Sequence, residues 1–293
     1  MQIRGLHTAI VTPFTSAGDI DREAFVRLID QQIASGVDGV VVCGSTGEGA
    51  TLSTDEKRML WQTAVERAEG RVVITAGTGT NDTRSTVELT RIAHTCGVDA
   101  VLLVTPYYNK PTPAGLLAHF RAIEEASDVP KIIYNVPGRT GQNVSAETQL
   151  AIANACRSVI ATKEASANLE QMCEIIRHAP SGFSLLAGDD VLTLPAIACG
   201  AAGVIAVISN YAPRQFGRLV HAALNGDYTV AQRQQMALMP FFAANFYESN
   251  PVPVKYILSL LGSIHAAYRL PLTEPSVQTQ QRLRELFTGY VDE

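Results

Sequence analysis

The sequence predicts an α/β protein built as a closed (β/α)8 TIM barrel with a C-terminal helical extension. Eight short apolar segments rich in β-branched residues recur along the first two thirds of the 293-residue chain, and helical patterns separate them. Successive segments lie roughly 20 to 35 residues apart, which is the size of a βα unit. Eight such units match a barrel, which typically needs about 250 residues, better than an open doubly wound sheet. We expect residues 1–225 to form the barrel and residues 226–293 the extension.

Each expected strand is nearly continuous in apolar character, as parallel strands are when both faces of the sheet are covered. A strand half exposed to water would alternate apolar and polar residues instead. In chain order the expected strands are residues 7–11, 37–43, 72–75, 100–104, 131–134, 159–162, 184–186 and 204–208.

Apolar residues spaced by three and four positions indicate the helices between these strands. Phe25, Leu28 and Ile29 give such a face after the first strand. Ser53 and Glu56 form a capping-box pattern, which predicts that a helix begins there.

Ser145 is the expected N-cap of a helix between the fifth and sixth strands. After about residue 212 the pattern is entirely helical, which predicts the last barrel helix and then the extension. The apolar faces expected in this part carry Leu219 with Val220, Met236 with Met239, and Tyr256 with Leu260.

Composition and charge exclude several classes of protein. The chain is 46% hydrophobic and 17% charged, so it can bury enough surface to fold and is not a disordered protein. Its 23 Lys and Arg against 28 Asp and Glu give a formal net charge of −5 without a basic cluster, so we expect no nucleic-acid partner. No apolar run approaches the about 20 residues that cross a bilayer, and the N-terminus lacks a signal-peptide pattern. We expect a cytoplasmic protein without membrane contact.

The sequence also predicts neither a metal nor a cofactor. The five cysteines are scattered without a Cys-x-x-Cys pair, which favours reduced thiols. The six histidines lack the spacing of zinc ligands. A dinucleotide fingerprint is absent, because Asp82 stands where the third glycine after Gly77 and Gly79 would be needed.

In such a barrel the active site lies at the C-terminal ends of the strands. Hydroxyls, phenols and one lysine follow the expected strands and should converge at this mouth. The segments that follow the eight strands are Thr12-Pro13, Gly44-Ser45-Thr46-Gly47-Glu48, Gly77-Thr78-Gly79, Thr105-Pro106-Tyr107-Tyr108-Asn109, Tyr134-Asn135-Val136-Pro137-Gly138-Arg139, Lys163-Glu164, Gly188-Asp189-Asp190 and Ser209-Asn210.

Lys163 is the expected nucleophile. A lysine at a strand end can simply extend its ammonium into water. Inside a barrel mouth, however, desolvation lowers the pKa of a lysine, and the neutral amine forms a Schiff base with a carbonyl substrate. Tyr134 ends the neighbouring strand, where its phenol is either a core aromatic or a proton shuttle for that amine.

The remaining polar residues of the mouth allow two interpretations each. Ser45 and Thr46 form either a strand-to-helix turn or a small anion cradle. Arg139 is either a surface arginine or a clamp for a substrate carboxylate. Asp189 and Asp190 would repel phosphate; they could hold Mg²⁺, but we expect them to accept hydrogen bonds from the N–H groups of the next helix.

Together these residues resemble a known family, the pyruvate-dependent class I lyases that include dihydrodipicolinate synthases and N-acetylneuraminate lyases. The resemblance covers essentially the whole chain, and its motifs are specific only in combination. The motifs are Thr12-Pro13-Phe14, Gly44-Ser45-Thr46-Gly47-Glu48, Ala76-Gly77-Thr78-Gly79, Thr105-Pro106-Tyr107-Tyr108-Asn109-Lys110-Pro111, Tyr134-Asn135-Val136-Pro137-Gly138-Arg139-Thr140-Gly141, Lys163-Glu164-Ala165, Gly188-Asp189-Asp190 and Asn250-Pro251-Val252-Pro253-Val254-Lys255.

The resemblance implies a lyase of lysine (diaminopimelate) biosynthesis that condenses pyruvate with L-aspartate 4-semialdehyde to 4-hydroxy-tetrahydrodipicolinate. Lys163 would form the Schiff base with pyruvate. Tyr134, Ser45 and Tyr108 would relay protons, with Tyr108 supplied by a neighbouring subunit of a homotetramer assembled as a dimer of dimers.

The resemblance also implies the residues that bind the two substrates. Ser45 and Thr46 would hold the pyruvate carboxylate, and Gly188 and Ile205 would line the pyruvate pocket. Arg139 would bind the carboxylate of the semialdehyde, as in the dihydrodipicolinate synthases.

Two alternatives remain open at this point. One is another pyruvate-dependent aldolase of the same family, acting on N-acetylneuraminate or on a 2-keto-3-deoxy sugar acid. Ser45 fits that branch, because the synthases usually carry threonine there. The other is a barrel that binds a keto acid without catalysis, which would have no use for a proton relay.

Overall fold

A computed structural model describes residues 2–292 and confirms the closed eight-stranded parallel barrel. Residue 1 of the expected barrel (1–225) and residue 293 of the expected extension (226–293) lie outside the described part. Each strand pairs with the next one in the chain, and β8 closes the ring on β1. The strands are β1 (Gly5–Ala9), β2 (Gly39–Val42), β3 (Val73–Gly77), β4 (Ala100–Val104), β5 (Lys131–Asn135), β6 (Val159–Glu164), β7 (Ser184–Ala187) and β8 (Gly203–Ala206).

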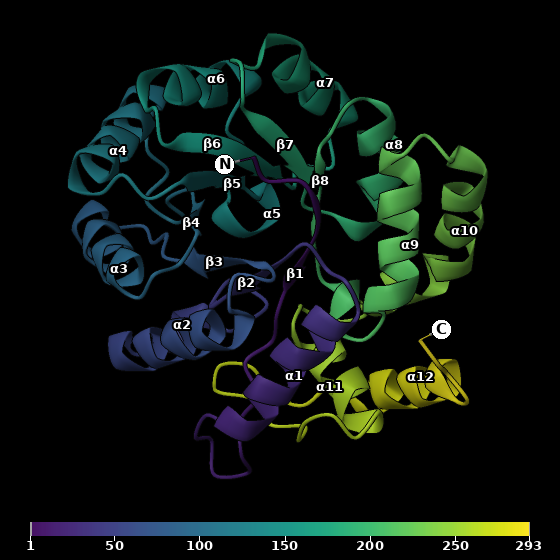
Figure 1. The fold of residues 1–293 in the computed structure, drawn as a ribbon. Coiled ribbons are helices and arrows are strands. Elements are labelled where there is room, and N and C mark those ends of the chain that lie inside the picture. Colours follow the sequence, from purple (N-terminus) through teal and green to yellow (C-terminus); the bar gives the residue numbers. More distant parts are fainter. Residues whose placement is uncertain (1, 293) are drawn as a thin grey trace.

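Helices surround this barrel, as Figure 1 shows, and the short α5 lies close to its mouth. Three 3-10 turns, η1 (Gly49–Thr51), η2 (Asp190–Leu192) and η3 (Ile208–Asn210), follow β2, β7 and β8. The helices are α1 (Arg22–Ala34), α2 (Thr54–Ala68), α3 (Thr83–Thr95), α4 (Pro113–Ala126), α5 (Pro137–Thr140), α6 (Ala146–Ala155), α7 (Leu169–His178), α8 (Thr193–Ala198), α9 (Pro213–Leu224), α10 (Tyr228–Ala244), α11 (Val252–Leu260) and α12 (Val277–Phe287).

The strands read as continuous apolar runs because the barrel wall separates two apolar regions. A small cluster that includes Leu102, Ile132 and Ile205 fills the interior of the barrel. A much larger one, which includes Leu103 and Ile133 on the opposite face of the same strands, packs beneath the helices. Successive residues of a strand point to opposite faces, so both faces of each strand are buried.

The two helix starts that the sequence predicts are confirmed. Ser53 caps α2 in a capping box with Glu56, and the Ser145 hydroxyl accepts a bond from the Thr148 amide at the start of α6. Each cap satisfies an amide that the first turn of a helix leaves without a partner.

All but one of the expected strands differ from the observed ones by one or two residues at an end, and two of these differences bear on the site. The expected strand 204–208 ends at Ala206, because the amides of Val207 and Ile208 turn away to the buried Asp190 carboxylate. The expected strand 159–162 continues through Lys163 and Glu164, so the predicted nucleophile lies within the sheet and not after it. Apolar content alone marked neither end, since Val207 and Ile208 are buried outside the sheet and Lys163 and Glu164 are buried within it.

The helical extension packs on one side of the barrel. The helix α10 lies along α9, and α11 contacts α12 (Figure 1). The apolar face expected from Met236 and Met239 is wrong, since both side chains are exposed and α10 buries Leu238 and Phe242 instead. In residues 2–292 no helix is long and apolar enough to cross a membrane.

A buried ion pair ties this extension to the barrel mouth. Lys255 of α11 binds Glu48, which follows β2, and both side chains are removed from solvent. The Lys255 amine also lies 4.2 Å from the centroid of the Phe14 ring, just after β1. Glu48 further accepts a bond from the amide of Arg269, whose guanidinium pairs with Glu56 of α2. Removing one partner of such a pair leaves a buried charge without compensation, so these contacts fix how the extension meets the barrel.

The opposite end of the barrel carries a titratable pair. The His221 ring of α9 lies 2.7 Å from the Asp38 carboxylate, which also accepts a bond from the Leu6 amide. This hydrogen bond raises the pKa of His221 above its ordinary value of 6.5. Burial would raise the pKa of Asp38, but its bonds with His221 and Leu6 outweigh that effect and lower it.

We expect the wild type to be more stable than His221→Gln by an amount that depends on pH. Because the folded pKa of His221 is raised, its contribution is fully present below about pH 6.5 and is lost as the pH rises through the folded value. Urea unfolding of both proteins from weakly acidic to weakly alkaline pH measures the difference. The exposed His265→Gln is the control, and a His221→Gln deficit that grows with pH contradicts the prediction.

Candidate active site

The alternation of residues along β5 and β6 places the central pair of the site. Tyr134 and Lys163 are register partners on the neighbouring strands, and so are Asn135 and Glu164. Tyr134 belongs to the cluster inside the barrel, and the Lys163 amine lies 4.4 Å from the centroid of its ring. Because successive residues face opposite sides, Asn135 and Glu164 point outward toward the helices. The structure thus brings together the two residues that the sequence singled out first.

Lys163 differs from the other buried lysines in its partners. Lys131 at the start of β5 binds Glu124 and two backbone carbonyls, and Lys255 binds Glu48. Within residues 2–292 the Lys163 amine has no hydrogen-bond or ion-pair partner. Lys163 is 5% exposed, against 0% for the other two. It is therefore a largely buried amine beside the Tyr134 ring, and Tyr134, not Lys163 itself, lines the cavity at the mouth.

Glu164 is held on the far side of the sheet by a dense set of donors. Its carboxylate accepts bonds from the side-chain amides of Asn135, Gln149 and Gln171 and from the Ser166 backbone amide. These partners come from β5, α6, α7 and the loop after β6. The network fastens β5 to β6 directly behind Tyr134 and Lys163. Sequence analysis gave Glu164 no role, because the donors lie up to 29 positions away in the chain.

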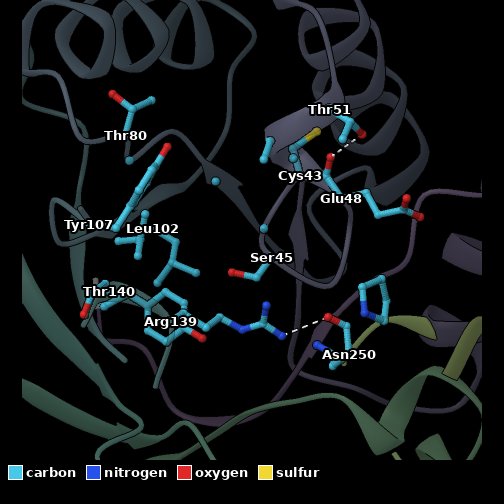
Figure 2. Close-up of a pocket in the computed structure, with 18 of the residues that line it drawn as sticks. Cys43, Ser45, Glu48, Thr51, Thr80, Leu102, Tyr107, Arg139, Thr140 and Asn250 are labelled. Carbon is cyan, nitrogen blue, oxygen red and sulfur yellow. Dashed lines mark hydrogen bonds between the residues drawn. The ribbon is translucent and has the colours of Figure 1, made fainter. Parts of the chain in front are cut away.

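A cavity of about 440 Å³ opens at the mouth. Its lining includes Ser45, Tyr134 and Arg139, and Figure 2 shows Arg139 extending across it toward Asn250. An Arg139 nitrogen donates to the Asn250 backbone carbonyl at 2.9 Å. Arg139 forms no ion pair within the described residues, so its guanidinium is free to bind an anionic substrate. Lys57 also lines this cavity, and burial lowers its pKa.

The turn after β2 brings Ser45 to the cavity, and the next residue, Thr46, is buried. Cys43 and Glu48 adopt positive φ angles of 60° and 52°, which reverse the chain within a few residues. A Cβ on Gly49 would lie 2.1 Å from the Cys43 carbonyl oxygen, so the turn needs glycine there. Ser45 is exposed toward the cavity, whereas Thr46 is buried and its hydroxyl accepts a bond from the Asn250 side chain.

Gly188 and Ile205 lie near the central pair. Ile205 is fully buried in the same interior cluster as Tyr134. Gly188 follows β7, where a Cβ would lie 2.5 Å from the Ala165 Cβ and 3.0 Å from the Glu164 carbonyl oxygen. Its lack of a side chain therefore allows the end of β7 to approach the residues that follow Lys163.

Tyr107 and Tyr108 are neighbours in sequence but lie differently with respect to the cavity. Tyr107 lines the cavity. Tyr108 is 88% exposed, with a φ angle of 72°, and does not line the cavity that Tyr134 and Ser45 line. Among the predicted catalytic residues, Tyr108 is the one that a single chain does not bring to the site.

The two aspartates after β7 do not act as predicted. The Asp190 carboxylate accepts bonds from Val207 and Ile208, which follow β8, and not from the next helix. Burial raises the pKa of Asp190 to about 6 and also raises that of Asp189. In the described part of the chain, no group of His, Cys, Asp and Glu residues could hold a metal ion.

Asn250 is the contact residue that sequence analysis missed. The motif that contains it was quoted for the resemblance, yet no role was given to it. Its partners Thr46 and Arg139 are 204 and 111 positions away, so only the folded structure brings the three together.

Comparisons with known proteins give the family to which this chain is similar. The profile of the dihydrodipicolinate synthetase family matches residues 2–289. The 4-hydroxy-tetrahydrodipicolinate synthase of Maridesulfovibrio salexigens is 47% identical over 272 residues, which cover 93% of each chain. The enzyme of that name from Aquifex aeolicus is 42% identical over 98% of this chain and 97% of its own.

Solved structures give the same result. The crystal structure of dihydrodipicolinate synthase from Aquifex aeolicus matches with a TM-score of 0.95 and 42% identity over 97% of both chains. That of the synthase from Thermotoga maritima matches with a TM-score of 0.95 and 39% identity over 98% of both chains. Sequence and fold therefore agree along nearly the whole length, and the chain belongs to the dihydrodipicolinate synthetase family.

Proposed function

We propose that this chain is the lyase that condenses pyruvate with L-aspartate 4-semialdehyde to 4-hydroxy-tetrahydrodipicolinate, in lysine (diaminopimelate) biosynthesis. The carrying observation is the desolvated Lys163 amine, which has no protein partner within residues 2–292 and lies 4.4 Å from the Tyr134 ring centroid. Relatives of this chain at 42% to 47% identity carry the name 4-hydroxy-tetrahydrodipicolinate synthase. These names favour the synthase over a lyase of the sialic-acid or sugar-acid type.

The reaction begins when the neutral Lys163 amine attacks the keto carbon of pyruvate. Formation of the carbinolamine moves one proton from the nitrogen to the oxygen, and a second proton delivered to its hydroxyl then releases water and leaves the iminium. The resulting iminium loses a methyl proton and becomes an enamine, which attacks the aldehyde carbon of the second substrate. Water, or the amino group of that substrate on ring closure, then releases Lys163. The Tyr134 phenol and the Ser45 hydroxyl are the groups of this chain placed to carry the protons.

The two substrate carboxylates have separate binding groups. Ser45 and Thr46 hold the carboxylate of pyruvate above Lys163, and Gly188 and Ile205 shape the space around its methyl and keto groups. Arg139 binds the carboxylate of the semialdehyde, since a guanidinium fork suits a carboxylate. No metal or cofactor enters this scheme.

A neighbouring subunit supplies Tyr108 in this proposal. Exposure of 88% beside a cavity-lining Tyr107 suits a side chain that enters the site of another copy. Exposed Met239 and Phe246 border a second cavity of about 370 Å³, which supports a further contact and hence a tetramer of two dimers. The free state of all five cysteines supports a cytoplasmic location.

Reduction with borohydride in the presence of pyruvate tests the nucleophile. We expect the wild type to gain the mass of pyruvic acid less one oxygen atom, on the peptide that contains Lys163. Lys163→Met should gain no such mass and should lose at least about a thousandfold in kcat. Wild type without pyruvate is the control. Normal turnover by the variant, or a label on Lys131 or Lys255, contradicts the proposal.

Arg139→Ala tests the second substrate. We expect the KM for aspartate semialdehyde to rise about ten- to a hundredfold, the size of a lost charge-assisted hydrogen bond. The KM for pyruvate and the borohydride-trapped adduct should stay unchanged. N-acetylneuraminate, assayed beside the semialdehyde, should not be cleaved by either protein. Cleavage of the sialic acid in place of condensation would assign the chain to the other branch.

Mixing two inactive variants tests whether Tyr108 acts in the neighbouring subunit. Tyr108→Phe and Lys163→Ala are each expected to be nearly inactive. Hybrid dimers contain one site with both native residues, so random reassembly of equal amounts should restore about a quarter of the wild-type activity. Mixtures that stay inactive, although mass spectrometry detects the hybrids, would place Tyr108 in its own subunit's site, and normal activity of Tyr108→Phe alone would place it outside the relay.

A further inference from the structure

Asn250 joins the two halves of the site that bind carboxylates. It lies in the loop between α10 and α11, lines the cavity and is 5% exposed. Its side-chain nitrogen Nδ2 lies 3.0 Å from the Thr46 hydroxyl, and its backbone carbonyl accepts a bond from Arg139 at 2.9 Å. One residue of the extension therefore contacts both predicted carboxylate-binding groups.

The contact with Thr46 has a defined direction. An amide NH₂ group donates only, so the Thr46 oxygen is the acceptor in this bond. The single proton of that hydroxyl is then free to be donated elsewhere. Within residues 2–292 this hydroxyl makes no second hydrogen bond. A hydroxyl held in this state is suited to donate to an anion that enters the cavity.

The position of Asn250 is itself fixed from behind. The helix that follows it, α11, carries Lys255, which forms the buried ion pair with Glu48. Glu48 belongs to the same turn as Thr46, and Thr12 binds the Gly47 carbonyl at 2.6 Å within that turn. The ion pair thus fastens α11, which follows the loop that donates the bond, to the turn that accepts it, and Thr12 anchors that turn to the end of β1.

We propose that Asn250 is a positioning residue that sets the Thr46 hydroxyl as a donor toward the carboxylate of pyruvate, while its backbone holds Arg139 for the second substrate. The inference rests on the proposed function, because it takes Thr46 as a ligand of pyruvate. The side chain of Asn250 acts on one substrate and its backbone on the other, so side-chain variants separate the two effects.

Asn250→Ala and Asn250→Asp measure the side-chain effect. Asn250→Ala removes the donor, so we expect the KM for pyruvate to rise about fivefold, the size of one neutral hydrogen bond. Asn250→Asp replaces the donor by a carboxylate, which accepts a hydrogen bond from the Thr46 hydroxyl and adds a negative charge. We therefore expect the KM for pyruvate to rise about fiftyfold or more. In both variants the KM for the semialdehyde should change less than about twofold, since the backbone carbonyl still holds Arg139.

The pH profile of Asn250→Asp gives a readout that a purely structural role would not move. Burial raises the pKa of a carboxyl, and a protonated carboxyl can donate to Thr46 as the amide does. We therefore expect the pyruvate KM of this variant to approach that of the wild type as the pH falls. A defect that is equal at every pH contradicts the proposal.

A double-mutant cycle with Thr46→Val completes the test. If Asn250 acts through the Thr46 hydroxyl, adding Asn250→Ala to Thr46→Val should leave the pyruvate KM of Thr46→Val nearly unchanged. Effects that multiply, or equal rises in both KM values, overturn the role proposed for Asn250. An unchanged pyruvate KM in Thr46→Val alone instead overturns the proposed ligand role of Thr46. The borohydride adduct on Lys163 reports separately whether the Schiff base still forms.

Discussion

The geometry of the site depends on the two-residue period of β6. Lys163 and Glu164 are neighbours in sequence, yet the strand sends one into the barrel and the other outward. If both faced the same way, the carboxylate could pair with the amine. Instead amide donors behind the sheet bind Glu164, and the amine inside the barrel stays without an anionic partner among the described residues. The same bonds fasten β5, which carries Tyr134, so one strand register places both members of the central pair.

The helical extension acts on the site as well as on stability. A buried ion pair such as Lys255 with Glu48 gains little net stability, because desolvating two charges offsets much of their attraction. It does define one arrangement, since any other leaves a charge buried alone. Here that arrangement sets α11, the turn after β2 and the loop that carries Asn250 relative to one another. The chain thus uses a long-range contact to fix a loop that local sequence leaves free.

Much of the fold could be predicted from sequence because its signals are local. Apolar runs at regular intervals predicted the eight strands, and Ser53 and Ser145 marked helix starts through contacts three residues away. Lys163 and Tyr134 could be named because parallel strands bring their C-terminal ends to one edge. Other features could not be predicted from the sequence: the end of β8, the exposure of Met236 and Met239, and the contacts of Glu164 and Asn250. Each depends on partners far along the chain, and a run of apolar residues contains no information about them.

The three fully or nearly buried lysines show why one of them is chemically distinct. Burying an ammonium is costly unless anions and carbonyls compensate it, and the surroundings of Lys131 and Lys255 supply such partners. The buried ammonium groups of Lys131 and Lys255 are thus each compensated by an ion pair with a glutamate. The Lys163 amine has no such ion pair among the described residues, although its charge acts on the carboxyls of Asp189 and Asp190.

Neither of those carboxyls forms an ion pair with Lys163 in the part of the chain that the structure describes. Asp190 is buried and bonded to backbone amides, Asp189 is half-buried, and desolvation raises the pKa of both. The Asp190 carboxylate already accepts bonds from two backbone amides, and Asp189 makes no ion pair with the Lys163 amine among the described residues. An amine kept from pairing, at a place where the barrel interior opens to a cavity, is the arrangement that nucleophilic attack on a ketone requires.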